Sequence, residues 1–149
     1  MSPLVKKILL CLAPVALAFS AGPQFSSDKP VINFRLPAFT PEGYRAWMVR
    51  GSEARYASEK RIGIKDLTLS IFTGQADEKV DTLILSPNAV VHPDESLVTG
   101  STAIRVINDQ FEATGTDWRF NQVDKRNFKV SIAKNVRVTF QAEFKDLLK

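Results

Sequence analysis

Apolar and polar residues alternate along much of this chain, most regularly within Phe111–Phe140. Every second residue is apolar in three segments of that stretch: Trp118–Phe120, Phe128–Ile132 and Val136–Phe140. A period of two places the apolar side chains of a β-strand on one face and the polar ones on the other. Clusters of turn-forming residues separate the segments, at Asn121–Lys125 and Ala133–Asn135. The stretch therefore predicts three short strands with one apolar face.

The same alternation predicts further strands upstream, with turn residues at their ends. The expected strands are Val31–Phe39, Tyr44–Arg50, Glu53–Tyr56, Arg61–Phe72, Val80–Leu85, Ala89–Val91 and Ser96–Ile107. The last of these is either a strand pair or one strand bent at Gly100. Predicted breaks fall at Gly51–Ser52, Ser86–Asn88 and His92–Glu95. Roughly ten strands separated by turns predict an all-β domain: a sandwich, a roll or a barrel.

A weak internal recurrence accompanies these strands. Asp66–Ile71, Thr102–Ile107 and Asn135–Phe140 have a similar form, and they begin 36 and then 33 residues apart. A fixed period of this kind suggests stacked β-hairpin units that bury a shared face. A sandwich with evenly spaced turns would imitate the same pattern.

The N-terminal residues have the pattern of a secretory signal peptide. Lys6 and Lys7 precede the apolar run Ile8–Phe19, and small residues follow it. The run is shorter than the ~20 residues that a membrane span needs, and an uncleaved anchor is the alternative. The 149-residue chain is then divided into a signal peptide (1–20), a flexible lead-in (21–30), one domain (31–140) and a tail (141–149) with helix-like spacing of apolar residues.

Composition narrows the functional classes. Cys11 is the only cysteine and lies inside the predicted signal peptide, so the exported chain has no thiol for a disulfide, a nucleophile or a metal site. Export without disulfides favours a bacterial periplasm. Without Lys6 and Lys7 the 20 basic residues become 18 against 16 acidic ones, and no run of Lys and Arg remains. Nucleic acid is therefore not an expected partner.

No residue pattern indicates catalysis. His92 is the only histidine and lies in a His-Pro-Asp-Glu turn, where an exposed turn residue is the simpler interpretation. His92, Asp94 and Glu95 have side chains that bind metals, but adjacent turn residues lack the spacing of a metal site. Asp117, next to Trp118, is either a saccharide contact or a turn-capping carboxylate, and the second is favoured. The sequence predicts a protein that is not an enzyme and uses no cofactor.

The one-sided apolar strands have two interpretations. They are either the core of a closed sandwich or the inner face of a sheet pair that is not fully closed and accepts alkyl chains. Periodicity does not separate the two.

Several short motifs follow one another along the chain: Asn33–Phe39, Gly51–Tyr56 with Asp66–Leu69, Ser86–Ala89, Ala113–Trp118 and Lys134–Val138. Together they cover about Val31–Phe140, and in order and spacing they resemble the LptC/OstA-like family. The resemblance implies a periplasmic β-jelly roll shaped like an open taco. Members of that family pass lipopolysaccharide from the inner-membrane exporter towards the outer membrane, with acyl chains held between two sheets. LptC-type members usually keep a membrane helix, so a cleavable N-terminus favours an LptA-like bridge.

On this basis we expect a non-enzymatic carrier of lipopolysaccharide or a related lipid. The family has no catalytic motif from which site residues carry over. The candidate groove residues are apolar residues of the predicted strands: Leu67, Leu69, Ile71, Leu83, Leu85, Ile104, Val106, Trp118, Phe120, Phe128, Val130, Ile132, Val136 and Val138. Each is alternatively plain core, because a small domain needs most of its apolar residues to fold. Arg119 and Arg137 are candidate contacts for lipid phosphates, and the alternative for both is a solvated face.

Partner docking is the second expected function. An open roll leaves strand edges that accept a partner's strand through backbone hydrogen bonds. Val31–Leu36 and Asn135–Phe140 are the candidate edges for other β-jelly-roll proteins of the transport system. The alternative is a periplasmic scaffold domain with a closed core and no lipid, and a hydrolase that depends on His92 comes third.

Overall fold

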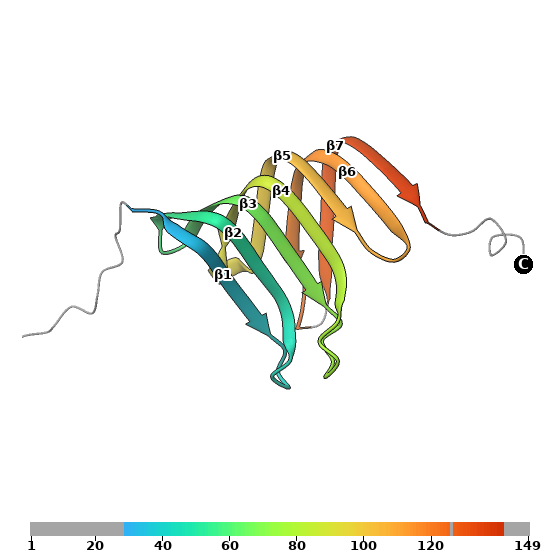
Figure 1. The fold of residues 1–149 in the computed structure, drawn as a ribbon, viewed down its shortest axis with the longest axis horizontal. Helices are drawn as coiled ribbons and strands as arrows, with labels where there is room; N and C mark the ends of the chain where they lie inside the picture. The colour runs from blue at the N-terminus through green and yellow to red at the C-terminus, as the bar shows by residue number, and fades with distance from the viewer. Residues whose placement is uncertain (1–28, 126, 142–149) are drawn as a thin grey trace, which may run out of the picture.

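The computed structural model describes residues 29–125 and 127–141, and β-strands make up most of this range. The strands are β1 (Val31–Phe39), β2 (Arg45–Ser58), β3 (Arg61–Phe72), β4 (Val80–His92), β5 (Leu97–Ile107), β6 (Phe111–Gln122) and β7 (Phe128–Phe140). A short 3-10 helix, η1 (Pro93–Glu95), joins β4 to β5. The predicted all-β class is confirmed (Figure 1).

The strands form one seven-stranded antiparallel sheet in which sequence neighbours are also spatial neighbours, from β1 to β7. Tight turns make this order possible. The Asn108 side chain accepts hydrogen bonds from the backbone N–H groups of Gln110 and Phe111, both at 2.9 Å, and so closes the β5–β6 turn. Within the described residues β1 and β7 each pair with one strand only, so they are the two edges of the sheet.

The strand count differs from the prediction, because three predicted breaks are bends inside continuous strands. Gly51–Ser52 lies within β2, Ser86–Asn88 within β4 and Ala133–Asn135 within β7. Residues that favour turns also occur where a strand bends sharply while its pairing continues on both sides. The predicted turn at His92–Glu95 is confirmed and contains η1.

The bends line up as a crease across the sheet. Buried positions normally alternate, but at the crease they are three residues apart, as from Ile64 to Leu67 in β3 and from Gly115 to Trp118 in β6. Asn and Asp tolerate the left-handed backbone conformation better than most residues because their short side chains hydrogen-bond locally. Four of them occupy the crease with φ between 51° and 56°: Asn33, Asp66, Asp117 and Asn135.

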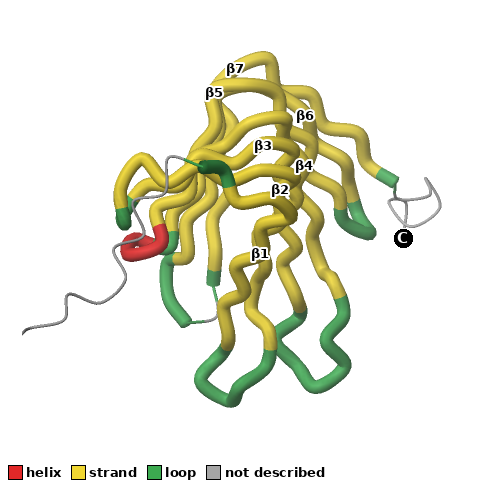
Figure 2. Tube along the Cα trace, turned by 60° about the vertical axis from the view of Figure 1, so that its left-hand side comes forward, coloured by secondary structure: helices red, strands yellow, loops and turns green. Residues whose placement is uncertain are grey.

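The crease divides the sheet into two walls that face each other (Figure 2). We define the first wall as residues 34–50, 67–85, 103–114 and 136–140, and the second wall as residues 31–32, 53–65, 88–100, 118–125 and 127–132. Each strand crosses from one wall to the other. The three recurring segments lie in β3, β5 and β7, where each runs from the crease into the first wall.

The space between the walls is filled mainly by side chains of β1 to β6. Their buried apolar residues are at most 7% exposed. Among the described residues of β7, Val130 and Ile132 are only partly buried against this core. The enclosed apolar face therefore extends from β1 to β6 and becomes open at β7.

Two glycines allow close packing at the crease. A Cβ on Gly100 would collide with the Trp118 indole, and a Cβ on Gly115 would collide with the side chain of Ile132. The pairing of β5 with β6 also shifts between Gly100 and Ala103. The predicted bend at Gly100 is thereby confirmed.

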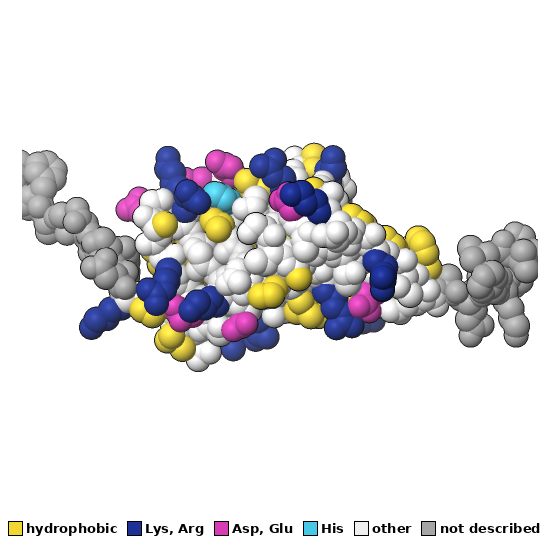
Figure 3. Space-filling model, turned by 90° about the horizontal axis from the view of Figure 1, so that it is seen from above, with side chains coloured by type: hydrophobic (Ala, Val, Ile, Leu, Met, Phe, Trp, Pro, Cys, Tyr) yellow, Lys and Arg dark blue, Asp and Glu magenta, His cyan; other side chains and the backbone are white. Residues whose placement is uncertain are grey.

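On the surface, Lys and Arg side chains are spread along the whole sheet with acidic ones among them (Figure 3). No helix in the described part of the chain is long and apolar enough to cross a membrane. The predicted signal peptide, most of the lead-in and the predicted helix beyond Gln141 lie outside the described residues.

Candidate functional site

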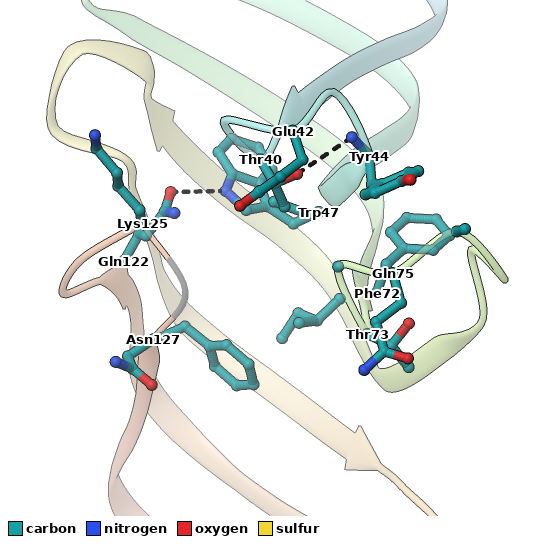
Figure 4. Close-up of a pocket in the computed structure, with 15 residues that line it drawn as sticks. Thr40, Glu42, Tyr44, Trp47, Phe72, Thr73, Gln75, Gln122, Lys125 and Asn127 are labelled. Carbon is teal, nitrogen blue, oxygen red and sulfur yellow. Dashed lines mark hydrogen bonds between the residues drawn. The ribbon is translucent and has the colours of Figure 1, made fainter.

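The free edges of the two walls enclose a cavity of about 400 Å³. The first wall contributes the turn at 40–44 and the loop at 73–76, and the second wall contributes Gln122, Lys125, Asn127 and Phe128 (Figure 4). The described floor is apolar and consists of Ala46, Trp47, Ile71, Phe72 and Phe128. An apolar cavity with a polar rim is the usual form of a ligand site.

A hydrogen bond joins the walls beside this cavity. Trp47 Nε1 in β2 donates to Gln122 Oε1 at the end of β6, at 3.1 Å (Figure 4). The buried Phe120 of the second wall packs against two residues of the cavity floor, with its ring centroid 6.2 Å from Trp47 and 5.9 Å from Phe128. The contact between the walls is therefore aromatic below and polar at the mouth.

Local polar contacts shape the rim. The Tyr44 backbone N–H donates to Thr40 Oγ1 at 3.2 Å in the β1–β2 turn. In the β3–β4 loop, Thr73 Oγ1 donates to Asp77 Oδ1 at 2.8 Å, and this hydrogen bond lowers the pKa of Asp77. Arg45 lies over the Phe72 ring, 5.5 Å from its centroid. These contacts hold both loops of the first wall in place around the mouth.

The predicted groove residues lie at three depths. Seven of them are buried core residues: Leu67, Leu69, Ile71, Ile104, Val106, Trp118 and Phe120. Val130 and Ile132 are partly buried against that core. Phe128 contacts Phe120 and lines the cavity, whereas Val136 and Val138 are exposed. Of the predicted groove residues, Phe128 and the buried Ile71 line the cavity, and Val136 and Val138 are open to solvent.

Leu83 and Leu85 require a correction, because they do not line the interior. Both are half-buried on the outer face of β4, while Ile84 between them is fully buried. The inward positions of this half of β4 are Thr82, Ile84 and Ser86. Thr82 and Ser86 are polar and Leu83 and Leu85 are apolar, so hydrophobic alternation indicates the wrong face here.

The inner face of β7 continues the apolar face but lacks a cover. Val138 pairs with Ala113 and Phe140 with Phe111, which places them on the side of the sheet that faces the core. Val136, Val138 and Phe140 are nevertheless 53%, 44% and 72% exposed. We call these three residues the β7 strip. An uncovered apolar strip beside a free strand edge is typical of a binding surface.

The residues considered for catalysis do not line this cavity, although Asp94 and Glu95 border a shallow pocket together with Gln122 and Lys125 of its rim. His92 ends β4, and Asp94 and Glu95 lie in η1. No group of three or more His, Cys, Asp or Glu residues within the described ranges could hold a metal ion. Asp117 is an exposed residue of β6 at the crease with φ of 56°, and it borders a surface pocket together with Trp118. Both interpretations of its carboxylate stay predictions.

Sequence reasoning missed several residues of the mouth: Tyr44, Phe72, Gln122 and Lys125. They lie in or beside loops, where alternation carries no information. Trp47 lies in the predicted strand Tyr44–Arg50, but the sequence leaves its facing ambiguous because Arg45 and Val49 share its phase. The pair Trp47 and Gln122, 75 residues apart in sequence, meets only after the sheet bends.

No family model matches this chain, and no curated protein matches it. The functional assignment therefore depends on the geometry of the two walls and on the resemblance of short motifs.

Proposed function

We propose that this protein is a periplasmic, non-enzymatic component of lipopolysaccharide transport to the outer membrane that binds lipid acyl chains between its walls. One observation carries the proposal: a continuous apolar face is folded onto itself and stays open at the mouth and at β7. We class this arrangement as an open β-jelly roll of the taco type. The motifs that resemble the LptC/OstA-like family support the same assignment.

Free-energy magnitudes favour binding at the mouth and the β7 strip over binding within the core. Burying ten methylene groups contributes about 8 kcal/mol, at about 0.8 kcal/mol each. Breaking the Trp47–Gln122 hydrogen bond costs only about 1 kcal/mol. Exposing the core costs about 1.5–3 kcal/mol for each large apolar side chain, and many would be exposed together. An acyl chain therefore enters where the face is already open.

The proposed carrier binds lipid without catalysing a reaction. A site built from apolar side chains holds an alkyl chain without polar specificity, because the hydrophobic effect is non-directional. Lipid then moves between proteins of similar affinity, and other components of the system supply the energy.

We further propose that the edge strands dock to partner β-rolls. Val31–Leu36 of β1 and Asn135–Phe140 of β7 remain the candidate edges. The β7 strip supports the second of these most strongly, since an added strand next to β7 would cover its exposed side chains. Charged substitutions along either edge are expected to abolish pull-down of the partner and to leave the fold unchanged. Unaltered pull-down would refute the docking role.

Site-specific photocrosslinking tests lipid binding. A photoreactive residue at Phe128 or Val138 is expected to label lipopolysaccharide, whereas one at Val90, on the outer face of the second wall, is the matched control. Mass spectrometry of lipids that copurify with the protein identifies the ligand independently. Equal labelling from all three positions, or none from Phe128 and Val138, would refute an interior lipid site.

A closed-core scaffold is the second candidate, and the tight burial of the core favours it. Eighteen apolar side chains of β1 to β6 are at most 7% exposed, so most of the interior is already filled. This candidate predicts no lipid labelling from any inner position and no copurifying lipid. The crosslinking experiment therefore separates the two functions directly.

A further inference from the structure

A row of arginines crosses the outer face of the first wall. The strand register aligns Arg35 with Arg50 and, further along the same row, Arg105 and Arg137. The whole row is Arg35, Arg50, Thr68, Leu85, Arg105, Thr114 and Arg137, one residue from each strand. With about 4.8 Å between strands, it spans about 29 Å beside the crease.

The charges of this row are mostly uncompensated. Arg105 Nε lies 2.6 Å from Glu112 Oε1, and this hydrogen bond lowers the pKa of the Glu112 carboxyl. Within the described part of the chain, Arg35, Arg50 and Arg137 form no ion pair or side-chain hydrogen bond. Arg35 and Arg50 are directly opposite on neighbouring strands, where like charges destabilise a sheet. Such an arrangement does not stabilise the fold, and it is better suited to binding an external anion.

Apolar side chains form the next row on the same face. The register aligns Met48, Ser70, Leu83 and Ile107 across β2 to β5, with Pro37 on β1 and Glu112 and Thr139 beyond. Met48, Leu83 and Ile107 are half-buried and remain in part open to solvent. The misassigned Leu85 belongs to the arginine row itself. Leu83 and Leu85 therefore lie on the outer face, where packing of the interior does not account for their apolar side chains.

The acidic residues of the first wall lie away from these two rows, Glu112 excepted. Glu42, Asp77, Glu78, Asp81 and Asp109 occupy turns, loops or strand ends at the free edge of the wall. Apart from Glu112 and the crease residue Asp66, the wall is thus basic and apolar near the crease and acidic at its rim. This distribution of charge defines how the protein is oriented when it binds an anionic surface: the crease side of the wall faces the anion, and the rim points away from it.

We propose that this face docks on the surface of an anionic lipid bilayer. The row arginines contact headgroup phosphates, which suit the planar guanidinium, and the Met48–Ile107 row lies towards the acyl boundary. Two other ligands use this surface less completely than a bilayer does. A bound nucleic acid would leave the apolar row exposed to water, and a small anion would contact at most the pair Arg35 and Arg50. Basic side chains extend over the full length of the sheet (Figure 3). This surface is separate from the mouth, so the proposal does not depend on interior lipid binding.

Vesicle cosedimentation of the full chain tests the surface. The probe is phosphatidylcholine vesicles with or without phosphatidylglycerol, at low and high salt. Each basic residue near an anionic membrane contributes about 1 kcal/mol, so the variant Arg35→Gln/Arg50→Gln/Arg137→Gln is expected to bind on the order of 100-fold more weakly. Binding of the unaltered chain should also weaken as salt is added.

A second variant controls for net charge. Arg61→Gln/Arg119→Gln/Lys129→Gln removes the same charge from the outer face of the second wall and should reduce binding less than about fivefold, the weight of one basic residue. Equal losses in the two variants would mean that net charge alone acts, and would overturn the proposal. Loss of binding in inorganic phosphate at constant ionic strength would indicate a free-anion site and would also overturn it.

A fluorescence experiment locates the contact independently of charge. In a Cys11→Ser background, an environment-sensitive dye is attached at Leu83→Cys or at Val90→Cys, which lies on the outer face of the second wall. Anionic vesicles are expected to shift the emission to the blue from position 83 only. A shift that is equal at both positions, or confined to position 90, would place the membrane elsewhere. Circular dichroism of each variant verifies that the fold is retained.

Discussion

Replacement of Asp117 by valine tests whether the crease is set by backbone conformation. Asp117 lies in β6 with φ of 56°, is exposed, and precedes the buried Trp118. A β-branched residue is a strong outlier in this region of φ. The left-handed conformation costs about 1–2 kcal/mol for an ordinary L-residue. Asp117→Val should therefore lower the free energy of unfolding by that amount, although valine favours strands elsewhere.

Urea unfolding measures the effect. With an m-value of about 2 kcal/mol/M, a loss of 1–2 kcal/mol shifts the midpoint by about 0.5–1 M. Asp117→Asn should be nearly neutral, because asparagine tolerates the same conformation. Asp117→Gly should also remain within about 1 kcal/mol, since relief of strain is offset by the larger entropy of the unfolded chain.

Arg119→Val is the matched control for this test. Arg119 is an exposed, outward residue of the same strand, two positions from Asp117, and its φ is not positive. Its replacement should change stability by less than about 0.5 kcal/mol. If Asp117→Val and Arg119→Val destabilise equally with unchanged m-values, the positive φ at the crease is not the cause and the reasoning fails.

Three further predictions concern the core, the mouth and the surface charges. Phe120→Ala should destabilise by about 3–5 kcal/mol in urea unfolding, because Phe120 is fully buried; a loss below about 1 kcal/mol would contradict the packing. Gln122→Leu removes the acceptor for Trp47 and should cost about 1 kcal/mol with a shift in tryptophan fluorescence; an unchanged spectrum would show that the mouth is open in solution. The Arg105 hydrogen bond lowers the pKa of Glu112, so its stabilising effect is present above the unfolded-state pKa and is lost as pH falls through the folded pKa. Arg105→Gln should raise the Glu112 pKa in an NMR titration, and identical titration curves would refute this.

Hydrophobic alternation predicts the strands well where they are regular. β1 and β3 have the bounds that the sequence pattern indicates, Val31–Phe39 and Arg61–Phe72. It fails at the crease, because Asn, Asp, Gly and Pro favour turns and sharp bends alike. The useful signal there is the step of three between apolar residues, such as Ile64 to Leu67. That step shows that the chain changes phase without ending the strand.

The candidate site is harder to predict from the sequence than the fold is. In β4, Leu83, Ile84 and Leu85 are consecutive apolar residues between the polar Thr82 and Ser86, so alternation favours Leu83 and Leu85 as the inward phase, whereas the buried residue is Ile84. The mouth is assembled from two turns and one strand end that are distant in sequence. Local patterns therefore identify an apolar face but not the place where it opens.

The open end of that face limits how a partner binds. The β7 strip is roughly half exposed, so covering it contributes about 1 kcal/mol for each of Val136, Val138 and Phe140. Association costs about 4–15 kcal/mol in lost freedom of motion, which exceeds this gain. Backbone hydrogen bonds to the free edge of β7 add roughly 1 kcal/mol each. The strip alone therefore does not hold a partner, and strand pairing at β7 must act together with it, which favours a partner whose own edge strand has one apolar face.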